Sequence, residues 1–124
     1  MTESTIRASL VKKLRLHKDW LVLRHEDHYT SGIPDISITG NKITSWIETK
    51  FQKSFNLDNK GIQRYTLEKL DTFGYARYVI YTSESVGIVI PNRPETMIFP
   101  RHDHEAVVHY FRWLHAFPNS TLYT

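Results

Sequence analysis

The sequence predicts an α/β domain in which one mixed β-sheet has a helix on each side, followed by a C-terminal helix. Two observations lead to this fold class. Residues 36–38 and 43–47 alternate apolar and polar side chains around a Gly-Asn pair, which is typical of a β-hairpin. The segments 2–17, 60–73 and 103–117 repeat apolar side chains at helical spacing, and β-branched and aromatic runs lie between them.

Length and composition favour one soluble domain spanning residues 1–124. A chain of 124 residues can bury about two thirds of its surface and hold a core. It has no cysteine, which excludes disulfides and thiolate metal sites. No apolar run approaches the roughly 20 residues of a membrane span, and the N-terminus lacks the pattern of a signal peptide. We therefore expect no membrane partner and a cytoplasmic location.

The first predicted helix, residues 2–17, carries much of the positive charge. The chain has a formal net charge of +3, which permits a polyanionic partner. Only Glu3 and Asp19 are acidic within the first 24 residues. Six residues there are basic: Arg7, Lys12, Lys13, Arg15, Lys18 and Arg24. This surface is either a solvated face or one that follows the phosphates of a nucleic acid. Thr2 or Ser4 is expected to cap the helix.

The remaining elements follow in order. A short strand at 20–24 precedes a loop containing His25, Glu26 and His28, and the hairpin comes next. The 60–73 helix ends at a glycine and leads to strands at 75–82 and 86–90, so the second hairpin strand and the 75–82 strand should be parallel. Three prolines mark residues 91–100 as a loop, and the last helix follows.

The hairpin gathers charged side chains. A two-residue Gly40-Asn41 turn would pair Asp35 with Trp46, and alternate residues of a strand share a face. Asp35, Glu48 and Lys50 would then lie on one side, opposite the isoleucines. Glu48 would be diagonal to Asp35 across the ladder, with Cα atoms roughly 7–8 Å apart.

Two carboxylates and an ammonium in this arrangement suit metal-assisted chemistry. Mg²⁺ and Mn²⁺ prefer carboxylate, water and phosphate oxygens. Such an ion lowers the pKa of a bound water and neutralises charge on a phosphate. Lys50 can orient that water or stabilise developing negative charge. The alternative is a hairpin with an ordinary surface ion pair, which contributes little to stability.

The Pro34-Asp35 and Glu48-Thr49-Lys50 segments resemble the PD-(D/E)xK nuclease core. The Gly-Ile-Pro-Asp sequence at 32–35 and Ile62-Gln63 at a helix start resemble more narrowly the VRR-type nucleases. The resemblance covers roughly residues 3–82. It implies a restriction-endonuclease-like core and a DNA endonuclease that depends on Mg²⁺ or Mn²⁺.

The resemblance also implies roles for individual residues. Asp35 and Glu48 would bind the metal, the Thr49 carbonyl would add a ligand, and Lys50 would act on the attacking water. The first helix of these nucleases brings a glutamate to the metal, which is Glu3 in this chain.

Two further residues come from the same resemblance, each with an alternative. Glu26 competes with Glu3 as the third acidic ligand. Gln63 lies on the inward face of its helix and would bond near the lysine or the water, unless it simply caps a loop carbonyl.

The size of a stand-alone VRR-type domain implies a phage or bacterial enzyme acting on branched DNA such as four-way junctions. Two alternatives stay open. One is an endonuclease of restriction or repair type that cuts plain duplex DNA. The other is a nucleic-acid-binding module that has lost catalysis, although the intact set of Asp35, Glu48 and Lys50 argues against it.

The C-terminal helix is apolar over an unusually wide arc. Its polar positions Glu105, His109, Arg112 and His115 form one narrow stripe, and Trp113 lies on its flank. A helix that covers one sheet needs an apolar arc of about 100°. The excess surface predicts a two-fold homodimer with this helix in the contact. A deeper intramolecular groove under the 91–100 segment is the alternative.

Overall fold

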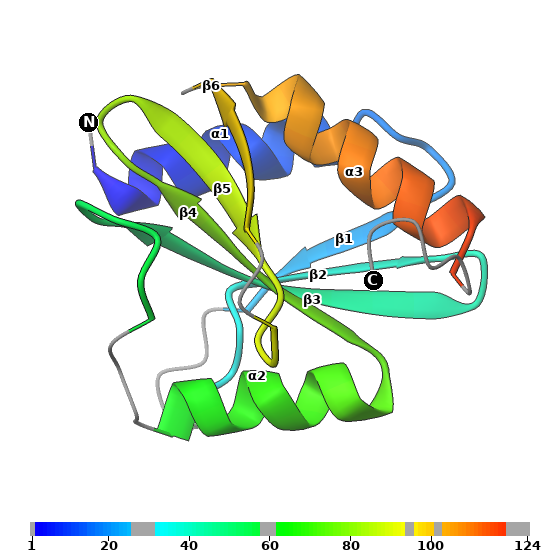
Figure 1. Ribbon diagram of the computed structural model, residues 1–124. Coiled ribbons are helices and arrows are strands. Elements are labelled where there is room, and N and C mark those ends of the chain that lie inside the picture. The colour runs from blue at the N-terminus through cyan, green and yellow to red at the C-terminus, as the bar shows by residue number, and fades with distance from the viewer. Residues whose placement is uncertain (1, 26–31, 58–61, 94–95, 101–102, 119–124) are drawn as a thin grey trace.

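The computed structural model describes residues 2–25, 32–57, 62–93, 96–100 and 103–118. The described helices are separated along the chain by groups of consecutive strands, as can be followed in Figure 1. In chain order they are α1 (Glu3–Leu14), β1 (Leu21–Arg24), β2 (Ile36–Gly40), β3 (Ile43–Phe51), α2 (Ile62–Phe73), β4 (Tyr75–Tyr81), β5 (Ser85–Val89), β6 (Thr96–Pro100) and α3 (His104–Ala116).

The strands of the described chain form one mixed sheet between two helical layers. The strand order is β1-β2-β3-β4-β5-β6, and β3 and β4 run parallel while the other neighbours run antiparallel. Helix α2 covers one face, and α1 and α3 lie side by side on the other (Figure 1). The predicted fold class is confirmed, including the parallel crossover through α2 and the C-terminal helix.

Each face of the sheet has its own apolar core. On the α1/α3 face the buried set includes Ile6, Leu10, Leu14, Ile36, Ile38, Ile47, Phe111 and Leu114. On the α2 face it is smaller and comprises Leu67, Ala76, Tyr78, Ile80 and Val89. The alternation of β3 explains the division, because successive residues of a strand face opposite sides. Ile47 packs on the α1/α3 face and Trp46 on the α2 face.

Helix α1 begins where the sequence predicts. Thr2 is the N-cap, and its side-chain oxygen accepts a hydrogen bond from the Thr5 amide at 3.2 Å. The Thr5 side chain bonds back to the Thr2 backbone, which satisfies a second amide at the helix start. The inward stripe of Ile6, Leu10 and Leu14 is buried as predicted. The helix N-terminus is thereby held against the sheet.

The β2–β3 turn has the predicted length but a shifted position. The structure pairs Gly40 with Ile43, so the two turn residues are Asn41 and Lys42. Both have positive φ values, 53° and 64°, as this type of hairpin turn requires. The prediction of Gly40-Asn41 as the turn is therefore wrong by one residue.

Packing explains why Gly40 lies in the strand. A Cβ atom at Gly40 would stand 2.5 Å from Cδ1 of Trp20, so the glycine lets the indole approach β2 closely. Asn41 instead adopts the left-handed backbone conformation, in which asparagine is enriched among non-glycine residues. The Asn41 side-chain amide also donates to the His115 carbonyl at 2.8 Å. The turn is thus fixed by tertiary contacts as well as by local sequence.

Three predictions for the C-terminal part are wrong. The supposed 91–100 loop contains β6, which pairs with β5. Phe117, the last residue of the predicted 103–117 helix, was expected to pack inward with the apolar side chains at helical spacing, but it follows α3 and is 60% exposed. His115, expected on the polar stripe, is buried, and burial lowers its pKa, so the ring is neutral. Its Nδ1 donates to the Gly40 carbonyl at 3.0 Å, and its Nε2 accepts from Ser45 Oγ at 2.8 Å.

No helix among the described residues is both long and apolar enough to cross a membrane.

Candidate metal and catalytic site

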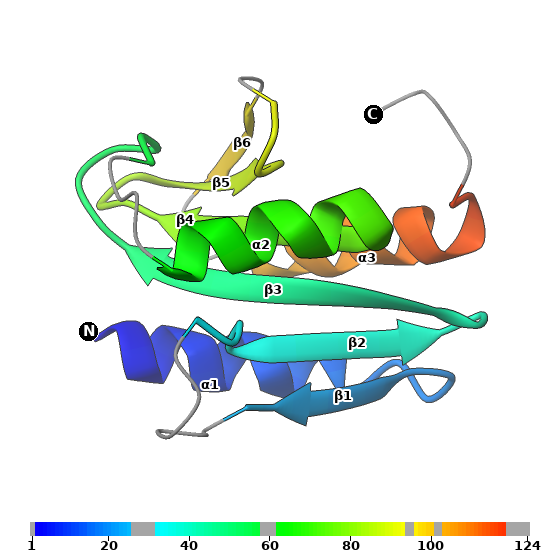
Figure 2. The ribbon, with the colours of Figure 1, turned by 90° about the horizontal axis from the view of Figure 1, so that it is seen from below.

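The charged residues of the hairpin lie at one end of the sheet. Asp35 directly precedes β2, whereas Glu48, Thr49 and Lys50 belong to the second half of β3. Figure 2 shows the start of β2, the end of β3 and the N-terminal end of α1 at the same end of the molecule. Because β3 lies within the sheet, between β2 and β4, its side chains here are shielded by neighbouring strands. The site is therefore anchored on regular structure.

The observed register sets the two acidic residues directly opposite each other rather than diagonally. Ile36 pairs with Ile47, so one further step along the ladder sets Asp35 opposite Glu48. The prediction had placed Asp35 opposite Trp46 and diagonal to Glu48. The error follows from the shifted turn, which moves the partner of each β2 residue by two positions and keeps the parity of the faces.

Glu48 is a buried carboxylate with one unsatisfied oxygen. The residue is only 3% exposed. Its Oε2 atom lies 3.5 Å from the Lys50 ammonium nitrogen, as expected for two residues on the same side of a strand. Its Oε1 atom is buried and has no hydrogen-bond partner among the residues that the structure describes. A buried polar atom without a partner is costly, so Oε1 is a candidate for binding a ligand.

The environment of Glu48 raises its pKa to about 7. Burial is the largest cause, because it disfavours the charged form, and the negative charge of Asp35 acts in the same direction. Lys50 and, more weakly, Arg7 oppose the rise. The carboxyl is therefore about half protonated near neutral pH, and a nearby cation would favour its ionised form.

Asp35 is held through a single oxygen by two hydrogen bonds and an ion pair. Its Oδ2 atom accepts from the Thr49 amide at 3.1 Å and from the Thr49 hydroxyl at 2.8 Å. The Arg7 guanidinium lies beside the same oxygen, with Nε at 3.1 Å. Arg7 Nε also donates to Thr49 Oγ1 at 2.9 Å. These contacts fix the carboxylate plane and leave Oδ1 for another partner.

The Asp35 contacts correct the predicted arrangement of faces. Glu48 and Lys50 share the parity of Trp46, which packs on the α2 face. Thr49 has the opposite parity, and Arg7 comes from α1 on the other face. Because Asp35 stands outside the strand, its side chain is free to turn toward Thr49 and Arg7. The two carboxylates therefore approach from different sides at the start of β2.

The residues present fit a divalent cation. The buried, unpaired Glu48 oxygen and the mutual repulsion of Glu48 and Asp35 would both be relieved by a positive ion between them. Both groups supply the hard oxygen ligands that Mg²⁺ and Mn²⁺ prefer. Among the described residues no group of three histidine, aspartate or glutamate side chains lies close enough to hold an ion. The structure thus supports a pair of protein carboxylates, with water and phosphate as the remaining ligands.

The other predicted site residues are not brought into this pair. Glu3 lies in the first turn of α1 and is partly exposed, but it does not form a three-carboxylate cluster with Asp35 and Glu48. Gln63 is in the first turn of α2, and its side chain lies outside what the structure describes, as does Glu26. Thr49 bonds through its amide and hydroxyl. The roles of Glu3, Gln63, Glu26 and the Thr49 carbonyl stay predictions.

Sequence reasoning missed Arg7 and the Thr49 hydroxyl. Arg7 was counted with the general basic surface of the first helix. The available signal was its position one helical turn after Glu3, on the side of the helix that an active-site residue would need. The Thr49 hydroxyl carried no signal, since its orientation depends on where Asp35 leaves the strand.

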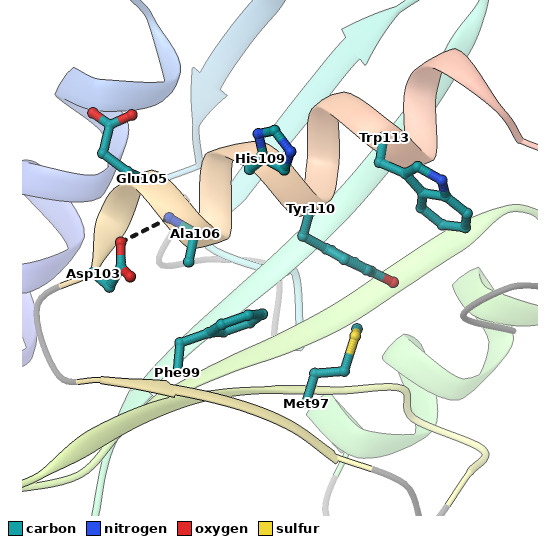
Figure 3. Close-up of a pocket in the computed structure, with 8 residues that line it drawn as sticks. All are labelled: Met97, Phe99, Asp103, Glu105, Ala106, His109, Tyr110 and Trp113. Atoms are coloured by element: carbon teal, nitrogen blue, oxygen red, sulfur yellow. Dashed lines mark hydrogen bonds between the residues drawn. The ribbon is translucent and has the colours of Figure 1, made fainter.

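A separate cavity of about 400 Å³ lies between α3 and β6. Figure 3 shows Tyr110 and Trp113 of α3 and Met97 and Phe99 of β6 extending toward each other, while Asp103 accepts from the Ala106 amide at 2.9 Å at the helix start. Asp35, Glu48 and Lys50 do not line this cavity. It is therefore a distinct feature of the α1/α3 face.

The architecture is that of a restriction-endonuclease-like fold. A solved structure of this class that it resembles is that of Hjc, a Holliday junction resolvase from the archaeal hyperthermophile Archaeoglobus fulgidus. The two structures superpose with a TM-score of 0.55 over 84% of this chain and 92% of that one, at 14% sequence identity. No protein-family model matches the sequence, and no curated protein matches it.

Proposed function

We propose that this protein is a DNA endonuclease that depends on Mg²⁺ or Mn²⁺ and acts on branched DNA such as four-way junctions. The observation that carries the proposal is the Asp35–Glu48 pair, in which one Glu48 oxygen is buried without a partner beside the Lys50 ammonium. The sequence resemblance to VRR-type nucleases and the fold shared with a Holliday junction resolvase support the same activity and the substrate class.

Each residue has a defined part in the proposed reaction. Asp35 and Glu48 would hold a divalent ion, which supplies positive charge against the phosphate and makes water more acidic. Lys50 places an ammonium next to Glu48, where it stabilises negative charge that develops on the phosphate oxygens. A water oxygen attacks phosphorus, the bond to one sugar oxygen breaks, and that oxygen takes up a proton.

The electrostatic state of Glu48 suits this reaction. In the absence of an ion its pKa of about 7 leaves the site with less negative charge than two ionised carboxylates would give. A bound cation favours the ionised form, so ion binding releases a proton. Glu48 thus becomes fully ionised only when the cation binds, so the site without an ion repels the DNA backbone less than two ionised carboxylates would.

The proposed active form is a two-fold homodimer in which α3 contributes to the contact. The cavity between α3 and β6 supports it, because Trp113 and Phe99 line an opening that the described residues leave unfilled. Phe117 at the end of α3 and Ile98 of β6 are also exposed. Strand β6 covers part of the wide apolar face of α3, so packing within one chain, the alternative to a dimer, explains part of that face. Two copies would carry two sites, as paired cuts in a symmetric junction require.

The experiment that tests the proposed function compares substrates. Purified protein is incubated with matched duplex, flap and four-way DNA, each with Mn²⁺ and with EDTA. The proposal expects cleavage in Mn²⁺ alone, fastest on the four-way DNA. Equal cutting of plain duplex would favour a restriction or repair enzyme. Binding of all three without any cleavage would favour a module without catalysis.

A further inference from the structure

Arg7 makes an unusual use of its guanidinium group. A single nitrogen, Nε, makes both of its contacts, at 3.1 Å to Asp35 Oδ2 and at 2.9 Å to Thr49 Oγ1. The Thr49 hydroxyl donates in turn to the same Asp35 oxygen at 2.8 Å. Arg7, Asp35 and Thr49 therefore form a closed triangle. Because the guanidinium is planar, holding Nε also fixes the direction of the two terminal nitrogens.

The terminal nitrogens of Arg7 are available to a ligand. Within the described part of the chain neither Nη1 nor Nη2 has a hydrogen-bond partner, and neither is among the buried atoms that lack one. The Arg7 side chain is 21% exposed. The two terminal nitrogens are therefore not sealed in the interior. A fixed pair of guanidinium donors matches two oxygens of one phosphate.

The positive charge of Arg7 offsets negative charge in the site. Asp35 and an ionised Glu48 contribute −2, and Lys50 alone returns +1, so these three groups would repel a DNA phosphate. Arg7 brings the sum to zero. The guanidinium lies beside the Asp35 carboxylate, with Nε 3.1 Å from Oδ2. It therefore lies at the proposed site of cleavage.

We propose that Arg7 is a phosphate clamp built into the carboxylate site. Its Nε atom is anchored by Asp35 and Thr49, and its terminal nitrogens bind a phosphate of the DNA strand that is cut. This inference rests on the proposed nuclease function. It extends that function to substrate positioning, since the residue that orients Asp35 also binds the substrate. A lysine could supply the charge but not the planar pair of donors.

The test is DNA binding without metal. Affinity for four-way DNA is measured in EDTA by fluorescence anisotropy between 50 and 200 mM salt, for wild type, Arg7→Gln and a control. The clamp predicts that Arg7→Gln weakens binding by about tenfold, as the loss of a charged hydrogen-bonded contact does. The slope of log affinity against log salt should fall by about 0.9, the value for one phosphate contact.

Arg112→Gln is the matched control, because it removes the same charge at the opposite end of the molecule. Arg112 is exposed on α3 and shares a pocket with Asn41 of the β2–β3 turn. That turn is five residue pairs from the Asp35–Glu48 level, roughly 17 Å along the strand. The control should change affinity less than twofold and leave the slope unchanged.

Two results would overturn the clamp. If Arg7 only orients Asp35, Arg7→Gln slows cleavage in Mn²⁺ but leaves metal-free affinity and its salt slope at wild-type values. Arg7→Lys covers the case in which Arg7→Gln does not fold, as judged by circular dichroism. It keeps the charge and loses the planar donors, so the clamp expects a near-normal slope with affinity reduced several-fold. Wild-type affinity in Arg7→Lys would contradict it.

The outcomes also separate the clamp from the nuclease proposal. A wild-type protein that cuts DNA while Arg7→Gln keeps the wild-type salt slope defeats the clamp alone. A wild-type protein that never cuts, yet shows an Arg7-dependent slope, defeats the nuclease function and retains a phosphate-binding arginine.

Discussion

Replacing Glu48 by glutamine should change the pH dependence of stability in a direction that the structure fixes. Burial and the charge of Asp35 raise the pKa of Glu48 from 4.5 to about 7 in the folded protein. Between these two values the folded state binds a proton that the unfolded state has lost. The stability that this group contributes is therefore fully present below pH 4.5 and is lost as pH rises through 7.

The size of the effect follows from the same two values. A tenfold change in an acid constant corresponds to about 1.4 kcal/mol, so a pKa moved from 4.5 to about 7 corresponds to about 3 kcal/mol. Glu48→Gln removes the titrating group while keeping its shape. Its free energy of unfolding, compared with that of wild type, should improve by about 3 kcal/mol between pH 4.5 and pH 8.

Urea unfolding in EDTA at several pH values measures this difference. Glu105→Gln is a control of opposite sign. Glu105 is an exposed glutamate whose pKa is lowered by its hydrogen bond to Lys13, so its stabilisation is lost as pH falls. Adding Mn²⁺ at pH 8 should stabilise wild type by ligand linkage and leave Glu48→Gln unchanged. A difference between wild type and Glu48→Gln that does not vary with pH would refute the buried carboxylate.

Four further predictions concern catalysis and assembly. Asp35→Asn should abolish cleavage and leave metal-free DNA binding intact or stronger. Lys50→Ala should lower kcat by about 10²-fold or more with little change in Mn²⁺ affinity. Wild-type turnover in either variant would remove that residue from the mechanism. Glu3→Gln should slow cleavage more than Glu26→Gln, and the reverse order in one assay would reassign the third acidic ligand. Light scattering at micromolar concentration should give twice the 14.6 kDa chain mass, halved by Trp113→Glu, and a wild-type monomer would contradict the dimer.

The sequence predicted the fold because its local patterns and its tertiary structure agree. The alternating hairpin, the helical stripe of Ile6, Leu10 and Leu14, and the parallel crossover through α2 all appear as expected. Each pattern indicates which side of a helix or strand is buried, because the spacing of the apolar residues follows the geometry of that element. Predictions failed where a contact between distant residues outweighed the local preference.

Gly40 and His115 illustrate those failures. A Gly-Asn pair is a strong local signal for a turn, but Trp20 requires the missing side chain of Gly40 within the strand. A histidine on an otherwise polar stripe reads as exposed, but Ser45 and the Gly40 carbonyl satisfy both ring nitrogens in the interior. In both cases the deciding partner is at least 20 residues away in the chain.

The geometry of the candidate site could not be predicted from the sequence. Strand alternation and the resemblance to the nuclease core selected Asp35, Glu48 and Lys50, and the structure places these residues at one end of the sheet. The sequence could not show that Asp35 turns toward Thr49 and Arg7, because this depends on where β2 begins. Nor could it show that Glu48 is buried with an unpaired oxygen, since burial here comes from the neighbouring strands.

The proposed function requires that Asp35 and Glu48 together hold the ion used in DNA cleavage. Single-turnover cleavage of a four-way DNA by wild type and Glu48→Gln over a range of Mn²⁺ concentrations tests this requirement directly. We expect a wild-type rate that rises with Mn²⁺ and saturates, no cutting in EDTA, and no cutting by Glu48→Gln at any concentration. Wild-type cleavage that persists in excess EDTA, or a Glu48→Gln rate equal to wild type, would contradict it.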